Sequence, residues 1–215
     1  MIRVVIADDH TIVREGLRQL LEAAGDIAVV AEAVNGHEVV DRIRDSEFDI
    51  LLLDLSMPGK SGMELIRQVK GEKPRLRILV LSMHQENQYA VRAIRAGASG
   101  YLTKDSASSL LVSAIRKLAA GGAFISAEVA EQLAHDAHGA GDAPPHTLLS
   151  DREFQVFRMI VAGTSLTRIG DELNLSIKTI STHKARLMQK MNVASQAELI
   201  RYAIAHKLTD DDAPG

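Results

Sequence analysis

Four short and mainly apolar runs, each followed directly by a polar side chain, constrain the fold of this chain more than any other feature. The runs and the residues after them are 4–7 before Asp8 and Asp9, 50–53 before Asp54, 78–81 before Ser82, and 100–103 before Lys104. Continuous Val, Ile and Leu runs of this length are typical of strands buried on both faces, as in parallel sheets covered by helices. Because ligands bind outside the carboxyl ends of the strands in such sheets, we expect the polar side chains to converge at one edge.

A fifth run, at residues 27–33, supplies the remaining strand, and helical patterns separate the strands. Apolar residues recur three or four apart at 11–24, 36–46, 62–73, 85–96 and 106–120. Five strands that alternate with five helices predict a parallel sheet with helices on both faces. The expected fold class is therefore a flavodoxin-like, doubly wound, five-stranded parallel α/β domain.

The chain changes character after this α/β region. Residues 126–135 form a further amphipathic stretch, and residues 136–145 contain few large apolar side chains but many Gly, Ala and Pro, which predicts a linker. Only helical patterns follow. We expect an α/β domain at 1–122, a helical segment and flexible linker at 123–146, a small all-α domain at 147–208, and an acidic tail at 209–215.

Charge is distributed unevenly between these regions. The 215 residues carry a net charge of −3, yet residues 148–208 contain nine Lys and Arg against five Asp and Glu, so that region is expected to meet an anionic partner. The absence of cysteine excludes disulfides and thiolate metal sites and agrees with a cytoplasmic location. No apolar stretch approaches the roughly 18 residues of a membrane span, and no export leader is expected.

Three carboxylates at one sheet edge predict a site for a hard divalent cation, since oxygen ligands and few protein donors suit Mg²⁺. Asp54 stands alone after its strand, ahead of a turn sequence that is expected to expose it. It is the candidate nucleophile for taking up a phosphoryl group as an acyl phosphate. Lys104 would place an ammonium, and Ser82 a hydroxyl, against the phosphoryl oxygens, while Asp8, Asp9 and Asp54 hold the metal.

Each of these residues also has a plainer interpretation. An Asp between a strand and a helix is often only an N-cap, and either Asp9 or Thr11 could cap the first helix. Ser82 by itself is more often a turn residue than a donor. A match of five residues at four strand ends favours a common site.

Residues 1–120 resemble the receiver domain of two-component response regulators. The matching residues are Asp8, Asp9, Asp54 with the following Met57-Pro58-Gly59 and Gly62, Ser82 and Lys104. The resemblance implies that a sensor histidine kinase phosphorylates Asp54, that the acidic pair binds Mg²⁺, and that the backbone carbonyl of Ser56 is a further metal ligand. It also implies that the hydroxyl and the lysine contact the phosphoryl group, and that Tyr101 rotates as the hydroxyl moves. Lys104 is followed by Asp105, where many receivers have Pro.

The C-terminal region opens on a capping box, in which Ser150 and Glu153 frame the first turn of an apolar helix. A short helix at 166–173 and three connecting residues lead to a second helix, which Ser176 caps. Two helices joined by so few residues predict a helix-turn-helix. The expected buried side of the second helix is Ile177, Ile180, Leu187 and Met191. Its other face is basic, hydroxyl-bearing and otherwise small, which suits the major groove of DNA, although a solvated charged face is the plainer alternative.

The order of motifs in residues 149–193 resembles the LuxR-type helix-turn-helix. Together with the receiver-like region, it makes the whole chain similar to the NarL/FixJ class of response regulators. The resemblance places Ser181, Thr182 and Ala185 toward the bases of double-stranded DNA, and Lys178, Thr179, Lys184 and Arg186 toward its phosphates. Since the base-facing side chains are small, DNA shape is expected to contribute to sequence preference.

The last helical pattern, at 197–207, carries an apolar stripe that is formed by Leu199, Ile200, Ala203 and Ile204. A lone domain of three or four helices is expected to leave such a stripe exposed, so we interpret it as the surface on which two copies pair. The chain is then expected to bind an inverted repeat as a homodimer when it is phosphorylated.

The pattern as a whole predicts a phosphorylation-controlled transcription regulator and not an enzyme. A phosphatase of the haloacid dehalogenase type, which also uses an aspartyl nucleophile, needs two Asp separated by one residue, whereas Asp8 and Asp9 are adjacent. A ligand-sensing LuxR-type quorum regulator needs a pocket with aromatic walls, and only 3% of these residues are aromatic, with no Trp. Incubation with a small phosphodonor separates the first two hypotheses.

Overall fold

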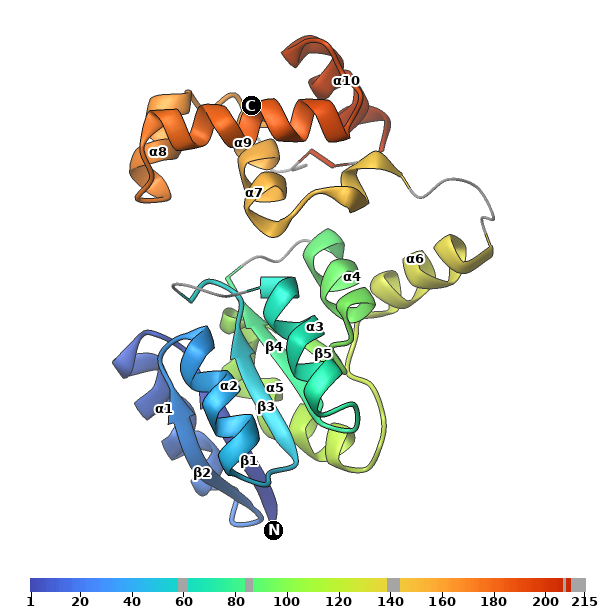
Figure 1. Cartoon of the computed structure of the whole chain (residues 1–215). Coiled ribbons are helices and arrows are strands. Elements are labelled where there is room, and N and C mark those ends of the chain that lie inside the picture. Colours follow the sequence, from blue (N-terminus) through green and yellow to red (C-terminus); the bar gives the residue numbers. More distant parts are fainter. Residues whose placement is uncertain (58–61, 84–86, 139–143, 207, 210–215) are drawn as a thin grey trace. The chain divides into compact units, whose positions relative to one another are not determined.

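The structure is a computed structural model of the 215-residue chain, and it describes every residue except 58–61, 84–86, 139–143, 207 and 210–215. Within the described part the chain forms two units, Met1–Gly139 and Ala140–Gly215 (Figure 1). Two features expected from the sequence, the turn at Pro58-Gly59 and the start of a helix at 85, lie outside the described residues.

The N-terminal unit is built on the five expected strands. They are β1 (Ile2–Ala7), β2 (Ile27–Ala33), β3 (Ile50–Asp54), β4 (Arg77–Ser82) and β5 (Gly100–Thr103). All pairs are parallel, in the order β2-β1-β3-β4-β5. The chain order reverses between β1 and β3, so their carboxyl ends flank the crevice where ligands bind in such sheets. The flavodoxin-like fold class is confirmed.

Helices cover both faces of this sheet (Figure 1). On one face lie α1 (Thr11–Glu22) and α5 (Lys104–Ala119), and on the other lie α2 (Gly36–Asp45), α3 (Gly62–Glu72) and α4 (Asn87–Ala96). Helix α5 begins two residues earlier than the expected position 106. The reason is that the Thr103 hydroxyl accepts the backbone N–H of Ser106 and caps the helix ahead of Lys104.

The plainer alternative, in which Asp9 or Thr11 caps α1, is wrong. The N-cap position is His10, whose side chain makes no capping hydrogen bond, and Thr11 is the first helical residue. The Asp8 carboxylate instead accepts the backbone N–H of His10 at 2.8 Å. Asp9 therefore plays no part in capping α1, which favours a role for its carboxylate at the end of the strand.

The central strands are buried on both faces, as their continuous apolar runs predict. Along β3 every residue from Ile50 to Leu53 is at most 1% exposed, and the last four residues of β1 are buried as well. Burying one Leu or Ile side chain stabilises a fold by roughly 1.5–3 kcal/mol. This packing fixes the strand ends and so holds the side chains that follow them.

A further helix, α6 (Ala127–His138), ends the N-terminal unit and corrects the expected linker boundary. Residues 136–138 belong to this helix, because its Ala, Glu and Gln residues are strong helix formers even where large apolar side chains are scarce. Val129 of α6 is buried against Ala90 and Val91 of α4, and the half-buried Tyr101 packs against the same cluster. The helix is thus part of the α/β unit.

The described part of the C-terminal unit forms a short 3₁₀ helix and four α-helices. They are η1 (Pro145–Leu148), α7 (Asp151–Val161), α8 (Leu166–Glu172), α9 (Ile177–Lys190) and α10 (Gln196–Ala205). The Ser150–Glu153 capping box and the Ser176 cap are both present, which confirms the helix-turn-helix. Ile177 was predicted to lie on the buried side of α9, and this prediction is wrong. It is 52% exposed, because the first turn of α9 extends beyond the packed part of the helix.

Only part of the apolar stripe of α10 is exposed at the surface. Leu199 and Ala203 are fully buried, since α10 packs against α7 within the same unit. Their assignment to a dimer surface is therefore wrong, whereas Ile204 is 61% exposed and Ile200 is half-buried. None of the helices in the described part of the chain is long and apolar enough to cross a membrane.

Candidate functional site

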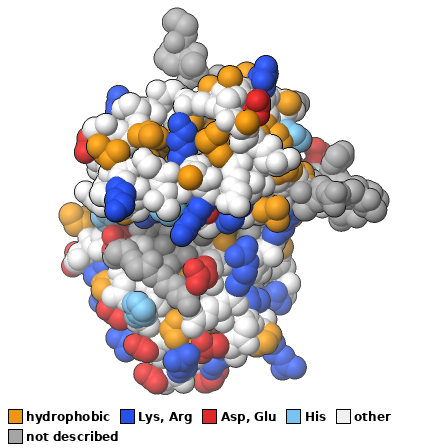
Figure 2. All heavy atoms as spheres, turned by 45° about the horizontal axis from the view of Figure 1, so that its top comes forward, with side chains coloured by type: hydrophobic (Ala, Val, Ile, Leu, Met, Phe, Trp, Pro, Cys, Tyr) orange, Lys and Arg blue, Asp and Glu red, His pale blue; other side chains and the backbone are white. Residues whose placement is uncertain are grey.

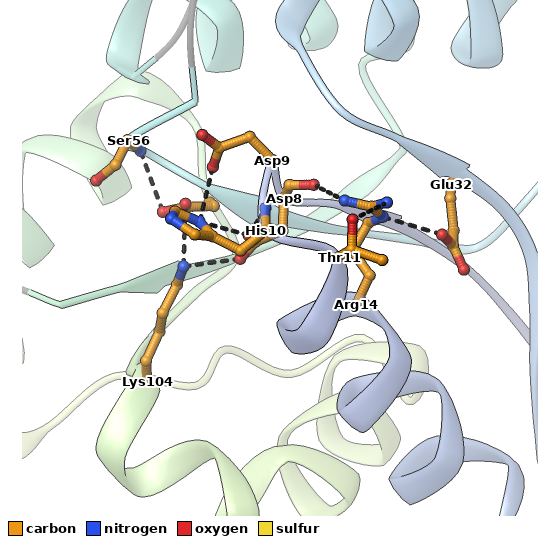
Figure 3. A network of polar contacts seen from close by, with 9 residues as sticks. Asp8, Asp9, His10, Thr11, Arg14, Glu32, Ser56 and Lys104 are labelled. Carbon is orange, nitrogen blue, oxygen red and sulfur yellow. Dashed lines mark hydrogen bonds and ion pairs between the residues drawn. The ribbon is translucent and has the colours of Figure 1, made fainter.

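The carboxyl ends of β1 and β3 and the start of α5 bring the expected polar side chains together (Figure 3). The cluster contains Asp8, Asp9, His10 and Asp54, whose potential ligand atoms all lie within 4.8 Å of one another, and Lys104 joins it from α5. The strand-end rule predicted the three Asp and Lys104 at this edge. The residues come from three segments that are up to 96 positions apart.

Lys104 bridges two buried carboxylates. Its Nζ lies 2.7 Å from Asp8 Oδ2 and 3.0 Å from Asp54 Oδ2. Burial by itself lowers the pKa of Lys104, but the hydrogen bonds and charges of Asp8 and Asp54 outweigh it and raise the pKa above its usual value. The ammonium therefore stays charged and lies where it can contact an anionic group on Asp54.

Asp54 is buried, which corrects the expectation of an exposed carboxylate. The residue is 1% exposed, because Lys104 contacts one carboxylate oxygen while the other accepts the backbone N–H of Ser56 at 3.1 Å. Burial raises the pKa of Asp54 despite these two partners. Its charged form is thus less well stabilised than in water, which is typical of a reactive carboxylate.

The acidic pair at the end of β1 has a donor set that fits a divalent cation. Asp9 Oδ1 is buried and accepts no hydrogen bond among the described residues, although His10 Nδ1 lies 3.0 Å from it. A buried carboxylate oxygen without a hydrogen bond is available to a cation. Sequence reasoning missed His10, and its only signal was its position directly after the acidic pair.

Two further residues that were expected at the site, Ser82 and Tyr101, lie on the neighbouring strands β4 and β5. Ser82 ends β4 in a fully buried position and is paired in register with Thr103 of β5. Tyr101 lies two residues earlier on β5, half-buried at the edge of the α4–α6 cluster. The Ser56 backbone N–H, two residues after Asp54, already donates to its carboxylate.

A second candidate site is the exposed face of α9. Five of the seven residues that were expected to contact DNA are exposed: Lys178, Ser181, Thr182, Ala185 and Arg186. Thr179 and Lys184 are half-buried and engaged locally, since Thr179 shares a hydrogen bond with Ser176, and Lys184 Nζ donates to Gln196 Oε1 at 3.3 Å. On the face of this unit in the upper part of Figure 2, basic and hydrophobic side chains are prominent and acidic ones are few.

An ion pair that sequence reasoning missed anchors α9. Lys190 Nζ lies 2.6 Å from Glu153 Oε2, so the end of α9 is tied to the start of α7. The sequence had assigned Glu153 only to the capping box, and no local pattern indicated a partner 37 residues away. Near this contact His183 is half-buried, burial lowers its pKa, and its Nδ1 has no hydrogen bond among the described residues.

Comparison with known families matches both units. Residues 4–116 match the response regulator receiver domain, and residues 147–203 match the family described as bacterial regulatory proteins, luxR family. The chain is 37% identical over 209 residues to the response regulator UvrY of Escherichia coli K12, covering 97% of this chain and 96% of that protein. It is 35% identical over 214 residues to the response regulator GacA of Pseudomonas viridiflava, covering 99% and 100%.

Similar chains are also found among solved structures. RcsB from Salmonella enterica serovar Typhimurium, bound to promoter rprA in the presence of the phosphomimetic BeF3-, is 31% identical with a TM-score of 0.60. That similarity covers 95% of this chain and 100% of the RcsB chain. Another solved structure, of two RcsB dimers bound to two parallel DNAs, has a TM-score of 0.58 at 31% identity, covering 95% and 98%.

Proposed function

The chain belongs to the NarL/FixJ class of two-component response regulators, which join a receiver domain to a LuxR-type DNA-binding domain, and on that basis we propose that phosphorylation of Asp54 controls its binding to DNA. It is a DNA-binding response regulator that controls transcription. The proposal places the receiver at 1–122, the helical segment and linker at 123–146, the DNA-binding domain at 147–208 and the acidic tail at 209–215. We place the protein in the cytoplasm, where bacterial DNA and the kinase domain of its partner are found.

One observation carries the proposal: the buried Asp54 carboxylate lies 3.0 Å from the Lys104 ammonium and beside the acidic pair. An oxygen of Asp54 attacks the phosphorus of a phosphohistidine on a sensor histidine kinase. The P–O bond forms as the P–N bond breaks, and the electron pair stays on the departing imidazole, which takes up a proton. The product is an acyl phosphate on Asp54.

The donors for Mg²⁺ are the carboxylates of Asp8, Asp9 and Asp54 and the backbone carbonyl of Ser56. The buried Asp9 oxygen, which accepts no hydrogen bond from any residue that the structure describes, supports this set. When bound, Mg²⁺ neutralises the charge that the phosphoryl oxygens bring to the site. Asp8 and Asp9 follow the buried end of β1, and the packing of this strand positions their backbone at the sheet edge.

Lys104 and Ser82 act on the phosphoryl group itself. The ammonium already points at Asp54, so phosphorylation exchanges a carboxylate contact for contacts with phosphoryl oxygens. The Ser82 hydroxyl donates from the end of the neighbouring strand. As Ser82 shifts, Tyr101 turns into the space that it leaves, and the phosphoryl group thereby biases an equilibrium between two arrangements.

The exposed face of α9 enters the major groove. Ser181, Thr182 and Ala185 face the bases, and the backbone contacts come from Lys178, Thr179, Lys184 and Arg186. The Thr182 hydroxyl donates to the Lys178 carbonyl at 3.0 Å in the free protein, so its oxygen remains available as an acceptor. Two copies pair on an inverted repeat, and the dimer surface is reduced to Ile200 and Ile204, because the other two stripe residues are buried.

The test is incubation of the full chain with a small phosphodonor and Mg²⁺, followed by intact mass measurement. A phosphoryl adduct that Asp54→Asn abolishes is the expected result. An undiminished adduct on that variant contradicts the assignment of Asp54, and steady release of phosphate without an adduct favours a phosphatase.

The link to DNA is tested with beryllofluoride. Sedimentation should report a shift toward dimer, and operator titration an increase in affinity of roughly 5- to 150-fold, the range that couplings of this kind span. A protein that stays monomeric with unchanged operator affinity contradicts the proposed control.

A further inference from the structure

We infer that Arg14 is a positioning residue for the metal-binding acidic pair, because it fixes the peptide unit that joins Asp8 to Asp9. The inference rests on the proposed function of this site. It adds a residue of α1, outside the cluster itself, on which the affinity for a divalent cation depends.

Arg14 lies beside the acidic pair, to its right in Figure 3, and its guanidinium contacts three partners. Its Nη1 donates to the backbone carbonyl oxygen of Asp8 at 2.8 Å, and its Nε donates to Glu32 Oε2 on β2 at 3.0 Å. Its Nη2 lies 3.4 Å from the Thr11 hydroxyl oxygen. The side chain is only 11% exposed, so these contacts form with little competition from water.

The carbonyl that Arg14 holds belongs to the same planar peptide unit as the Asp9 nitrogen. Fixing that oxygen sets the plane from which the Asp9 side chain departs. On the other side of the turn, the Asp8 carboxylate accepts the His10 N–H, so the conformation of the acidic pair is fixed from both ends. A preformed pair binds a cation without the loss of freedom that a mobile pair would undergo.

The effect of Arg14 on the metal is therefore geometric more than electrostatic. Glu32 pairs with the guanidinium at 3.0 Å and offsets its charge. Removing Arg14 changes the local net charge by one unit, but it leaves the carbonyl of Asp8 without its donor and frees the peptide to rotate. Loss of residues that orient metal ligands typically lowers metal affinity or activity 10- to 100-fold.

Arg18 provides a matched comparison within the same ion pair. It contacts the other carboxylate oxygen of Glu32 from one helical turn further along α1, and its side chain is 45% exposed. Both arginines thus link α1 to β2 through ion pairs with Glu32. They differ in the contact to the Asp8 carbonyl, which Arg14 makes from the turn nearer the acidic pair.

The experiment measures Mg²⁺ affinity by isothermal titration calorimetry on the full chain, for the wild type and for Arg14→Gln and Arg18→Gln. We expect Arg14→Gln to raise the dissociation constant about tenfold or more, and Arg18→Gln to leave it within about twofold of the wild type. Arg14→Lys should recover part of the affinity, because an ammonium can donate to the carbonyl but cannot also form the guanidinium contacts.

A second measurement separates positioning from a general structural role. The rate of phosphorylation by a small phosphodonor is followed against Mg²⁺ concentration. For Arg14→Gln we expect a higher half-saturating concentration with a nearly unchanged rate at saturation. A rate that stays low at saturating Mg²⁺, or equal changes in the Arg14 and Arg18 variants, would overturn the inference.

Two outcomes keep this inference distinct from the proposed function. A wild-type protein that binds Mg²⁺ but takes up no phosphoryl group contradicts the proposed function and leaves the titration of the Arg14 variants valid. Normal phosphorylation with the same Mg²⁺ affinity in Arg14→Gln contradicts the inference alone. If Arg14→Gln does not fold, as judged by circular dichroism, Arg14→Lys against Arg18→Lys carries the same comparison, because both variants keep the charge.

Discussion

Each of the two domains buries a carboxylate against a lysine that lies far away along the chain, yet the two carboxylates differ in how well they are stabilised. In the receiver, Lys104 Nζ lies 3.0 Å from Asp54 Oδ2, and burial still raises the pKa of Asp54. In the DNA-binding domain, Lys190 Nζ lies 2.6 Å from Glu153 Oε2. Burial also acts to raise the pKa of Glu153, but hydrogen bonds from Lys190 and Ser150 outweigh it and lower the pKa.

Each carboxylate accepts one hydrogen bond from a lysine and one from a backbone N–H, so the difference lies in burial and in the neighbouring charges. Glu153 accepts from Lys190 and from the Ser150 backbone, and it completes a capping box, so its charge is satisfied and its role is structural. Asp54 shares its lysine with Asp8 and lies beside other carboxylates, so its charged form gains when a cation or a phosphoryl group arrives. A buried Lys–carboxylate pair alone therefore does not mark a reactive site, whereas the direction of the pKa shift separates the two cases.

The largest expected effect follows from removing the receiver lysine. Lys104→Ala leaves Asp8 and Asp54 buried without their shared cation, and we expect a loss of about 3 kcal/mol in the free energy of unfolding without Mg²⁺. Calorimetric unfolding measures this loss, and added Mg²⁺ should restore much of it. The response to phosphorylation should fail, while Lys117→Ala, an exposed change on the same helix, serves as the control. A variant whose main defect is weaker Mg²⁺ binding would contradict the placement of Lys104.

The next largest effect is expected from a change in backbone packing that destabilises the DNA-binding domain. A Cβ added at Gly170 would lie 2.8 Å from the Leu175 carbonyl oxygen, so Gly170→Ala forces α8 away from the turn before α9. We expect a loss of about 2 kcal/mol, measured by thermal unfolding, and weaker operator binding. Gly16→Ala on α1 meets nothing within 4 Å and should instead stabilise the receiver by up to about 1 kcal/mol. Equal effects of the two substitutions would contradict the packing argument.

Acidification should change the contributions of Asp54 and Glu153 to the stability of their domains in opposite directions. Between the usual Asp value of 3.8 and the raised pKa of Asp54, this residue binds more protons in the folded receiver than in the unfolded chain, so its contribution to stability rises as the pH falls. Between the lowered pKa of Glu153 and the usual 4.5, the unfolded state binds more protons, so the DNA-binding domain loses stability. Calorimetric unfolding at pH 7 and near pH 4 measures both contributions. Asp54→Asn should remove the contribution of Asp54, and Glu153→Gln that of Glu153. Parallel shifts would refute the contrast.

The smallest effect concerns the exposed face of α9, which involves no buried charge. Lys178→Ala and Arg186→Ala should each lower the slope of log affinity against log salt by about one unit and weaken binding similarly on all sequences. Filter binding at several salt concentrations gives the slope. Arg201→Ala, an exposed change on α10, should leave it unaltered. A slope that does not respond to the loss of Lys178 means that this face does not contact the DNA backbone.

Much of this molecule follows from local pattern. The strand runs, the polar residue after each strand, the capping box and the helix-turn-helix are encoded within a few residues of one another, because side-chain periodicity and cap geometry act at short range. The strand-end rule then carries Asp8, Asp9, Asp54 and Lys104 to one edge, since parallel strands all present their carboxyl ends there. The exposed face of α9 is likewise a property of a single helix.

Tertiary structure decided what surrounds these residues. The burial of Asp54, the support that Arg14 and Glu32 give to the acidic pair, and the Lys190–Glu153 contact each join segments that are far apart in the sequence. The same holds for Leu199, which looks like a surface residue in its helix and is buried because α10 packs against α7. Periodicity states which side of a helix or strand is apolar, but burial and pKa depend on what packs against that side, and only the folded chain supplies that partner.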